Sequence, residues 1–271
     1  MSALCDAHNH LHDKRFLDKL PDIISSMQKS GITHCVVNGT SEDDWDRVLE
    51  LTRDHPHLAL PSIGLHPWNV PTRSEKWLER LTSVIIREQG RVFIGECGLD
   101  RWMHDPHFEE QKDVFISQLT LAATHNLPLS IHCLKAWGPL LDTLRTTDRP
   151  DRGFLLHSFG GSPELVPELV ELGAYFSFSG YFLREGKERV REAFRRVPPE
   201  RIMIETDAPD MLPPEKYLKY SVTHSGNGVL NHPANLASVM EGLAGILEMK
   251  ESCLRSLISD NFHSFFPVGP S

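Results

Sequence analysis

The most constraining feature of the sequence is an alternation of short apolar runs with longer amphipathic segments that continues almost to the end of the chain. Strand-like runs followed by helical periodicity are typical of βα units, whose strands form a parallel sheet. Eight strands are predicted: Ala3 to Ala7, Thr33 to Asn38, Ala59 to Gly64, Val92 to Gly95, Leu129 to His132, Phe154 to His157, Ala174 to Phe178 and Arg201 to Glu205.

Segments of helical periodicity fill the gaps between these strands. Glycine follows several of them, as in Ser30-Gly31 and Leu172-Gly173, and glycine readily adopts the left-handed conformation that closes a helix. The predicted helices are Leu20 to Ser30, Glu42 to Asp54, Glu75 to Gln89, Pro106 to His125, Gly138 to Thr146, Pro163 to Leu172, Glu185 to Val197 and Pro233 to Leu247.

Eight such units in 271 residues match the (β/α)8 barrel, whose usual size is about 250 residues. We therefore predict an α/β fold in which residues 1–271 form a single TIM-type barrel domain. Glu251 to Phe262 is expected to be an extra C-terminal helix that packs on the outside of the barrel. Ala208 to His232, rich in Pro, Gly and Tyr, is expected to be a long loop across the barrel mouth.

Charge and cysteine content limit the compartment and the partners. The sequence has 37 acidic and 28 basic residues, a net charge of −9, which disfavours a long duplex or an anionic membrane held by bulk electrostatics. Five cysteines without a Cys-x-x-Cys pair indicate reduced thiols. Neither a signal-peptide pattern nor a membrane-spanning apolar run is found, so we expect a cytoplasmic protein without membrane association.

Residues of metal-ligating type stand where the predicted strands end, and in such barrels catalytic groups come from the C-terminal ends of strands. His8 and His10 are two residues apart, so in an extended chain they point the same way and can bind one ion. The complete set at the strand ends is His8, His10, His66, Glu96, His132, His157 and Asp207.

Four of these imidazoles and two carboxylates exceed what one tetrahedral ion can use, so we expect two divalent ions that share a ligand. Glu96 can bridge because its carboxylate has two oxygens. The first ion would take His8, His10, Glu96 and Asp207, and the second Glu96, His132 and His157. Imidazoles favour Zn, whereas carboxylates and a phosphate substrate are also compatible with Mn or Mg.

Longer motifs surround these residues: Asp6-Ala-His-Asn-His-Leu11, Gly64-Leu-His-Pro67, Gly95-Glu-Cys-Gly-Leu-Asp100, Ile131-His-Cys133, Leu156-His-Ser-Phe-Gly-Gly-Ser162 and Glu205-Thr-Asp-Ala-Pro209. With them the chain resembles the TatD-type metal-dependent deoxyribonucleases, within the amidohydrolase-like barrels. The resemblance implies a (β/α)8 fold, a divalent metal pair, phosphodiester hydrolysis of DNA and the ligand roles given above. It also implies that His66 contacts phosphate or supports the metal ligands.

Three departures from the family pattern leave substrate preference open. Leu134-Lys135-Ala136 replaces the usual Arg-x-Ala, and strand alternation would aim Lys135 elsewhere unless the loop reorients it. Asn231-His232-Pro233 lacks the glutamate of the common Asn-Glu-Pro. Ser158 and Gly160 stand where Cys and Ser are common in the family.

Two carboxylates are the predicted catalytic residues, Asp207 and the bridging Glu96. Water held between two ions can attack phosphorus, and Asp207 would orient this water and accept its proton. The alternative is that Asp207 is only a metal ligand.

Residues on the loops after the strands could contact the substrate. Trp68, Trp102 and Trp137 could stack on bases, or could pack their own loops. Lys135, Arg101 and Arg184 could bind phosphate. The basic run from 184 to 196 is interleaved with glutamates, which indicates a solvated helix face with intrahelical ion pairs.

Other functions remain open at this point. A dinuclear barrel hydrolase could act on a small phosphoester, an amide, a lactone or a carboxylic ester, since the same activated water attacks carbonyl carbon. No lysine lies near Glu96 to act as a modified bridging residue, which favours a phosphoesterase. The expected substrate is DNA, as single strands or ends, or a small phosphoester. A metal-binding protein without turnover is the third possibility.

Overall fold

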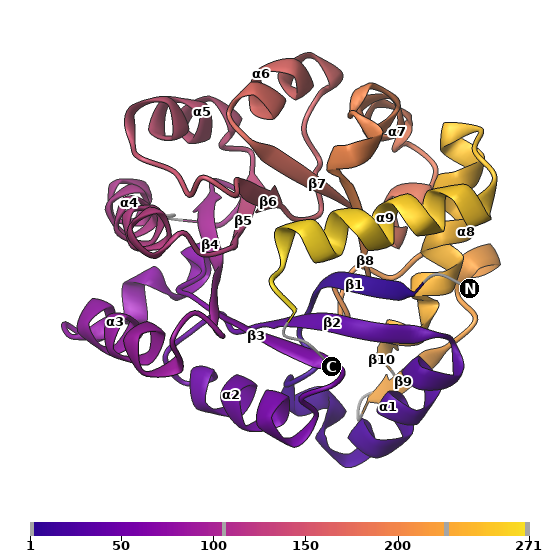
Figure 1. Ribbon diagram of the computed structural model, residues 1–271, viewed down its shortest axis with the longest axis horizontal. Helices are drawn as coiled ribbons and strands as arrows, with labels where there is room; N and C mark the ends of the chain where they lie inside the picture. Colours follow the sequence, from indigo (N-terminus) through magenta and orange to yellow (C-terminus); the bar gives the residue numbers. More distant parts are fainter. Residues whose placement is uncertain (1–2, 105–106, 225–227, 269–271) are drawn as a thin grey trace.

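The computed structural model describes residues 3–104, 107–224 and 228–268. Parallel strands follow one another in chain order in an eight-stranded sheet with helices around it, which confirms the predicted (β/α)8 barrel (Figure 1). The strands are β1 (Leu4–Asn9), β2 (Ile32–Asn38), β3 (Ala59–Ile63), β4 (Phe93–Asp100), β5 (Leu129–Leu134), β6 (Phe154–Leu156), β7 (Ala174–Ser179) and β8 (Ile202–Glu205).

The barrel closes where β1 meets the segment that follows β8. The carboxylate of Asp6 accepts hydrogen bonds from the Thr206 N–H at 3.0 Å and from its hydroxyl at 2.5 Å. The Asp207 N–H donates to the His8 carbonyl at 3.0 Å, and the His10 N–H donates to the Ala208 carbonyl at 2.8 Å. Closure therefore brings the two ends of the predicted metal site together, although about 200 residues separate them in sequence.

The surrounding helices are α1 (Leu20–Lys29), α2 (Trp45–Asp54), α3 (Trp77–Glu88), α4 (Phe108–His125), α5 (Trp137–Thr146), α6 (Val166–Glu171), α7 (Glu188–Arg196) and α8 (Leu236–Leu247). Their apolar sides are buried in the core cluster, as the amphipathic pattern predicts. The predicted start of the fourth helix, Pro106, lies outside the described residues. In the parts of the chain that are described, every helix is too short or too polar to cross a bilayer.

The basic face of α7 forms ion pairs largely within the helix, as predicted. Arg191 lies 2.7 Å from Glu188, and Arg195 lies 3.3 Å from Glu192. Arg189 instead pairs at 3.0 Å with Glu164, which precedes α6. These cations are therefore paired with neighbouring carboxylates.

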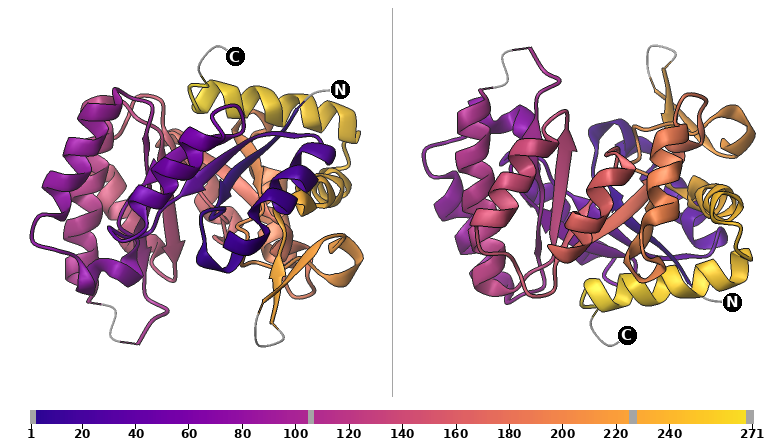
Figure 2. Two further views of the ribbon diagram at one scale, coloured as in Figure 1. Left: turned by 90° about the horizontal axis from the view of Figure 1, so that it is seen from below. Right: turned by 90° about the horizontal axis from the view of Figure 1, so that it is seen from above.

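The C-terminal helix α9 (Glu251–Phe265) crosses the end of the barrel at which the strands begin (Figures 1 and 2). Phe262, Phe265 and Phe266 are buried with Cys5 and Met203 in a cluster that we call the barrel floor. The helix therefore covers the end of the barrel instead of its outer face, because its aromatic side chains fill the opening between the strands.

The segment 208–232, expected as a loop, contains a β-hairpin of β9 (Ser221–His224) and β10 (Gly228–Asn231). The hairpin lies at the opposite end of the barrel from α9 (Figure 2). It is anchored next to β8, because the Asn231 side chain donates to the Thr206 carbonyl at 2.9 Å and its backbone N–H donates to Pro209 at 2.8 Å.

The fourth strand is longer than predicted. Glycines at 95 and 98 suggest a strand end in the sequence, but β4 continues to Asp100 and Gly98 pairs with His132 of β5. A Cβ atom on Gly98, whose φ is +140°, would lie 2.0 Å from the His132 carbonyl oxygen. Glycine therefore permits a close approach of the two strands, and Glu96 lies within a strand inside the barrel.

Candidate active site

Glu96 lies at the centre of the site and is 3% exposed. Its Oε1 atom is 2.8 Å from His157 Nε2, 3.1 Å from His132 Nδ1 and 3.3 Å from His66 Nε2. The facing nitrogens of His132 and His157 are themselves 3.3 Å apart. That separation is expected of two imidazole ligands on a tetrahedral ion with metal–nitrogen distances of about 2.0–2.1 Å.

The second carboxylate oxygen of Glu96 faces a different group. Its Oε2 atom lies 3.4 Å from both His8 Nε2 and His10 Nε2. Asp207 completes this group, since its Oδ1 atom is 3.3 Å from His10 Nε2 and 3.7 Å from His8 Nε2. The two oxygens of one buried carboxylate thus separate the predicted ligands into two sets.

The other ring nitrogens show which atoms are available for an ion. His10 Nδ1 lies 2.7 Å from the Asn38 carbonyl, which can only accept, so the ring proton is on Nδ1 and Nε2 carries the lone pair. His8 Nδ1 is bonded to Ser130 Oγ at 2.9 Å. Within the described chain, the buried Nε2 of His8 has no hydrogen-bond partner. A metal ion would satisfy this nitrogen, so the residues present fit such a group.

His132 and His66 use their nitrogens differently. His132 Nε2 faces Asp100 Oδ2 at 3.1 Å, which leaves Nδ1 as the atom that points to Glu96. His66 Nδ1 accepts the Trp68 N–H at 3.1 Å, so a neutral His66 carries its proton on Nε2 and donates to Glu96. This geometry suits the supporting role that the resemblance implies for His66 better than a ligand role.

Electrostatics keep the two carboxylates charged. Burial alone would raise the pKa of Glu96, but the His157 and His66 rings and hydrogen bonds to imidazoles hold it well below its usual value. Asp207 likewise has a lowered pKa: burial opposes the shift, but the His10 hydrogen bond and the charges of the nearby histidines together outweigh it. Burial lowers the pKa of His8, which favours the neutral ring that a cation requires.

A cavity of about 1150 Å³ opens above these residues, on the side away from the floor. Its lining includes His10, Glu96, His132, His157 and Asp207 as well as the loops that follow the strands. Trp68 and Trp102 also line it, and they are 56% and 63% exposed. The volume of the cavity is slightly above the range of about 300–1,000 Å³ that is usual for pockets that bind drug-sized ligands.

Of the predicted substrate residues near strands β4 and β5, Trp68 and Trp102 line the cavity, whereas Lys135 and Arg101 are not among its lining residues. The Trp68 indole N–H donates to Asp100 Oδ2 at 2.7 Å. Lys135 has a positive φ of 54°, and its ammonium lies over the Trp102 ring at 3.8 Å from the ring centre. The loop therefore does reorient Lys135. The Arg101 guanidinium lies over the Phe108 ring at 3.9 Å.

The remaining two predicted residues make contacts within the protein. Trp137 lines the cavity and packs edge-to-face against Phe159, with ring centres 5.0 Å apart. Arg184 donates to the Leu212 carbonyl at 3.0 Å and lies over the Tyr181 ring.

Several residues at the site were not predicted from sequence. Asp100, at the end of a quoted motif, orients His132, and the strand-end rule would have found it had β4 been placed correctly. Glu205 Oε1 lies 3.6 Å from His157 Nδ1 and accepts the Ser158 hydroxyl. Four cations also line the cavity, with no sequence signal to distinguish them: Lys14, Arg15, Arg47 and Lys187.

Arg15 joins two loops at the cavity wall. Its guanidinium binds the Asp210 carboxylate through two hydrogen bonds of 3.0 and 2.8 Å and also bonds Asp13. The contact links the segment after β1 to the segment after β8, and it neutralises two carboxylates near the mouth.

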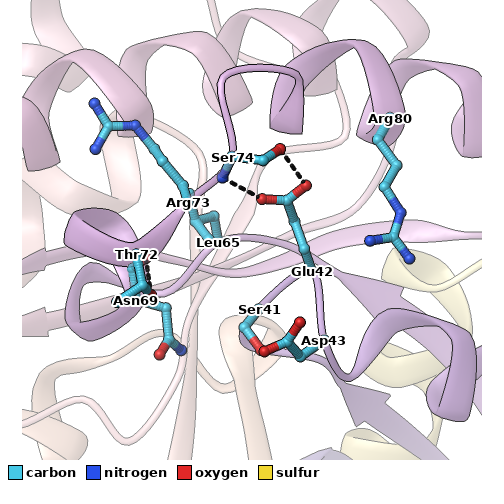
Figure 3. A pocket seen from close by; sticks show the side chains of 9 residues that line it. All are labelled: Ser41, Glu42, Asp43, Leu65, Asn69, Thr72, Arg73, Ser74 and Arg80. Atoms are coloured by element: carbon cyan, nitrogen blue, oxygen red, sulfur yellow. Dashed lines mark hydrogen bonds between the residues drawn. The ribbon is translucent and has the colours of Figure 1, made fainter.

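A smaller hollow of about 250 Å³ lies beside this cavity (Figure 3). Within it the Glu42 carboxylate accepts the Ser74 N–H at 2.7 Å and the Ser74 hydroxyl at 2.8 Å. The Arg73 guanidinium points away from Glu42 and pairs with Glu110 at 2.8 Å. These contacts hold neighbouring loops together, so we assign the hollow a structural role.

Comparison with known proteins agrees with this geometry. The sequence model of the family described as TatD related DNase matches residues 5–267. The chain belongs to this family. It is 30% identical over 273 residues to the uncharacterized metal-dependent hydrolase YcfH of Escherichia coli K12, covering 99% of this chain and 97% of that protein.

Two further relatives cover nearly the whole chain. The 3'-5' ssDNA/RNA exonuclease TatD of Escherichia fergusonii is 28% identical over 264 residues, which are 96% of this chain and 97% of that protein. The crystal structure of the TatD homologue YjjV of Escherichia coli K12 superposes with a TM-score of 0.87 at 26% identity, covering 98% of each chain. The predicted family, the barrel fold and the assignment as a metal-dependent hydrolase are therefore confirmed.

The structure of a lactonase from Listeria monocytogenes shares only the fold, with a TM-score of 0.64 and 13% identity.

Proposed function

We propose that this TatD-family hydrolase cleaves phosphodiester bonds in nucleic acid, preferably single strands or ends, with two divalent ions that share Glu96. The observation that carries the proposal is the division of the Glu96 oxygens between two sets of imidazoles. In this proposal residues 1–271 act as one catalytic domain in the cytoplasm. The name of the Escherichia fergusonii relative, an exonuclease of single-stranded DNA and RNA, supports the substrate class.

Each ion has a proposed ligand set. His8, His10 and Asp207 would hold one ion together with Glu96, as their distances to Glu96 Oε2 and to one another suggest. His132 and His157, whose facing nitrogens are 3.3 Å apart and lie near Glu96 Oε1, would hold the other. The donor chemistry of four imidazoles favours Zn, although Mn and Mg also suit the carboxylates and a phosphate substrate.

Bound there, divalent ions supply a water of lowered pKa and neutralise charge on the phosphoryl oxygens. The Asp207 carboxylate lies at the cavity wall, with 13% of its side chain exposed, so it can reach both the ligands and the substrate. Asp207 would hold the attacking water in position and would accept its proton at a carboxylate oxygen. His66 holds Glu96 in place through its Nε2–H.

The cavity mouth supports a nucleic-acid substrate. Trp68 and Trp102 expose indole faces on which bases can stack without regard to sequence, and Lys135 places a positive charge beside one of them. The net charge of −9 disfavours binding to many phosphates of a duplex, so recognition of a few bases of a single strand is the more favourable mode.

The test uses metal-reconstituted protein with labelled single-stranded DNA, duplex DNA, a small phosphodiester and a panel of lactones and carboxylic esters. We expect the single strand to be cleaved fastest. Hydrolysis of the carbonyl esters alone would overturn the proposal. Cleavage of the small phosphodiester alone would show that the substrate is a compact phosphodiester and not a nucleic-acid strand.

A variant tests the bridge. Glu96→Gln should abolish hydrolysis and lower the number of tightly bound ions, measured by elemental analysis after gel filtration. Glu109→Gln, on the surface of α4 with 82% of its side chain exposed, is the matched control. Two tightly held ions in Glu96→Gln would exclude a bridging role.

A further inference from the structure

A second group of metal-ligating side chains lies at the barrel floor, at the other end of the molecule from the cavity mouth. It comprises Cys5 of β1, His34 of β2 and His263 of α9. Each offers one ligand atom, and these three atoms lie within 4.8 Å of one another. Three segments that are far apart in sequence thus bring one sulfur and two nitrogens together where α9 crosses the strands (Figures 1 and 2).

The backbone fixes this arrangement. Cys5 and His34 are direct partners in the register between β1 and β2, so their side chains point to the same side of the sheet. His263 follows Phe262, which is fully buried in the floor cluster and fixes that turn of α9. As a result the rings of His34 and His263 meet edge to face, with centres 5.3 Å apart.

In both imidazoles Nδ1 has a hydrogen-bond partner within the protein, so Nε2 is the nitrogen that can bind an ion. The His263 Nδ1–H donates to the Ser259 carbonyl at 2.7 Å, which leaves Nε2 with a lone pair. His34 Nδ1 is 3.1 Å from the Thr33 hydroxyl, which also lies 3.5 Å from the Leu4 carbonyl. Burial, with a smaller effect of His263, lowers the pKa of His34, so the ring is neutral at neutral pH.

The thiol completes the set. Cys5 is 1% exposed, and its Sγ atom lies 3.9 Å from the Thr33 hydroxyl. Burial raises the pKa of this thiol to about 12, while the Thr33 hydrogen bond and, to a smaller extent, the charge of Arg255 act in the opposite direction. A bound cation displaces the thiol proton, as at other thiolate sites. The exposed face of His263 gives an ion a route from solvent.

We propose that Cys5, His34 and His263 bind a soft divalent cation of the Zn²⁺ class, with water as the fourth ligand. One thiolate and two imidazoles are ligands that such ions prefer over Mg²⁺ or Ca²⁺. The site differs from the active site, whose ligands are only nitrogen and oxygen. Because the ligands come from β1, β2 and α9, the ion fastens the C-terminal helix to the barrel floor.

Cobalt substitution separates the two sites. Co²⁺ bound by a thiolate gives a strong charge-transfer absorption in the near ultraviolet, and the active-site ligands cannot produce it. We expect this band in the full chain reconstituted with Co²⁺. Cys5→Ser should remove the band and one bound ion per chain, while the rate of substrate hydrolysis stays unchanged.

Two further variants complete the test. Cys253→Ser, at an exposed position on the same helix, should keep the band. His263→Gln, at an exposed position, should weaken Co²⁺ binding at the thiolate site at least about 10-fold. It should also abolish the part of the Zn²⁺-induced rise in Tm that this site contributes. Absence of the band at saturating Co²⁺, or its persistence in Cys5→Ser, would overturn the proposal.

Discussion

Replacing Asp100 by Ala tests how strongly contacts behind the metal ligands control the active site. Asp100 is fully buried, and its carboxylate accepts three hydrogen bonds. Oδ2 accepts from His132 Nε2 at 3.1 Å and from the Trp68 indole at 2.7 Å, and Oδ1 accepts the Trp102 N–H at 2.6 Å. The bond to His132 holds the ring proton on Nε2 and leaves Nδ1 facing Glu96.

Without this carboxylate, His132 can rotate and carry its proton on either nitrogen. Loss of such a partner typically weakens metal binding about 10- to 100-fold, which corresponds to about 1.4–2.7 kcal/mol. We expect this loss only at the site that contains His132 and His157, because His8 and His10 are oriented by Ser130 and Asn38 instead.

The assay is a competition titration with a chromogenic chelator, which resolves the two affinities, on protein whose fold is checked by circular dichroism. Asp100→Asn should weaken binding less than Asp100→Ala, because its amide oxygen can occupy the Oδ2 position and keep the bond to His132. Trp68→Phe removes the indole hydrogen bond to Asp100 and makes the ring smaller, but it keeps the bond between Asp100 and His132, so both metal affinities should stay near wild type. Native affinity at both sites in folded Asp100→Ala would refute the reasoning.

Three further predictions concern pH, substrate and metal. The His232 ring accepts the Ala234 N–H at 2.9 Å, and burial lowers its pKa to about 4. In the unfolded chain the His232 ring binds a proton near pH 6.5, whereas in the folded protein it does so only near pH 4. The contribution of the neutral ring to stability is therefore complete above pH 6.5 and is lost as the pH falls toward 4. Across that pH range the free energy of unfolding, measured in urea, should fall by roughly 1–3 kcal/mol more for the wild type than for His232→Asn. An equal fall in both proteins would contradict the prediction. Trp102→Ala should raise KM for single-stranded DNA by the equivalent of about 1–3 kcal/mol of stacking but leave KM for a small phosphodiester unchanged, and an unchanged KM for DNA would exclude stacking. Chelation should abolish hydrolysis and lower Tm, and added metal at about 100 times its Kd should restore about 2.7 kcal/mol of stability per site; a Tm insensitive to the chelator would argue against tightly bound ions.

The identity of the fold could be predicted because its signals are local. The strands and helices of the barrel are each 3 to 18 residues long, so the periodicity of each βα unit can be recognised on its own, and eight units define the barrel. The strand-end rule then selected Glu96 and the histidines around it, and the structure brings these residues together. Glu96 was chosen although its strand was predicted to end one residue earlier.

Contacts between distant segments were decided by the tertiary structure. The extension of β4 to Asp100 depends on pairing with β5 across Gly98, and a glycine in isolation favours a break. The position of Lys135 over Trp102 depends on a positive φ that no alternation rule predicts.

The sequence by itself determined the order of strands and helices, the family and the residue types at the strand ends, because these follow from neighbours along the chain. The tertiary structure alone decided which oxygen of Glu96 faces which histidines, and that α9 brings His263 to Cys5 across the floor. The physical reason is that periodicity reports only which face of a segment is buried. The partner that covers this face is set by sheet register and helix packing across the whole chain.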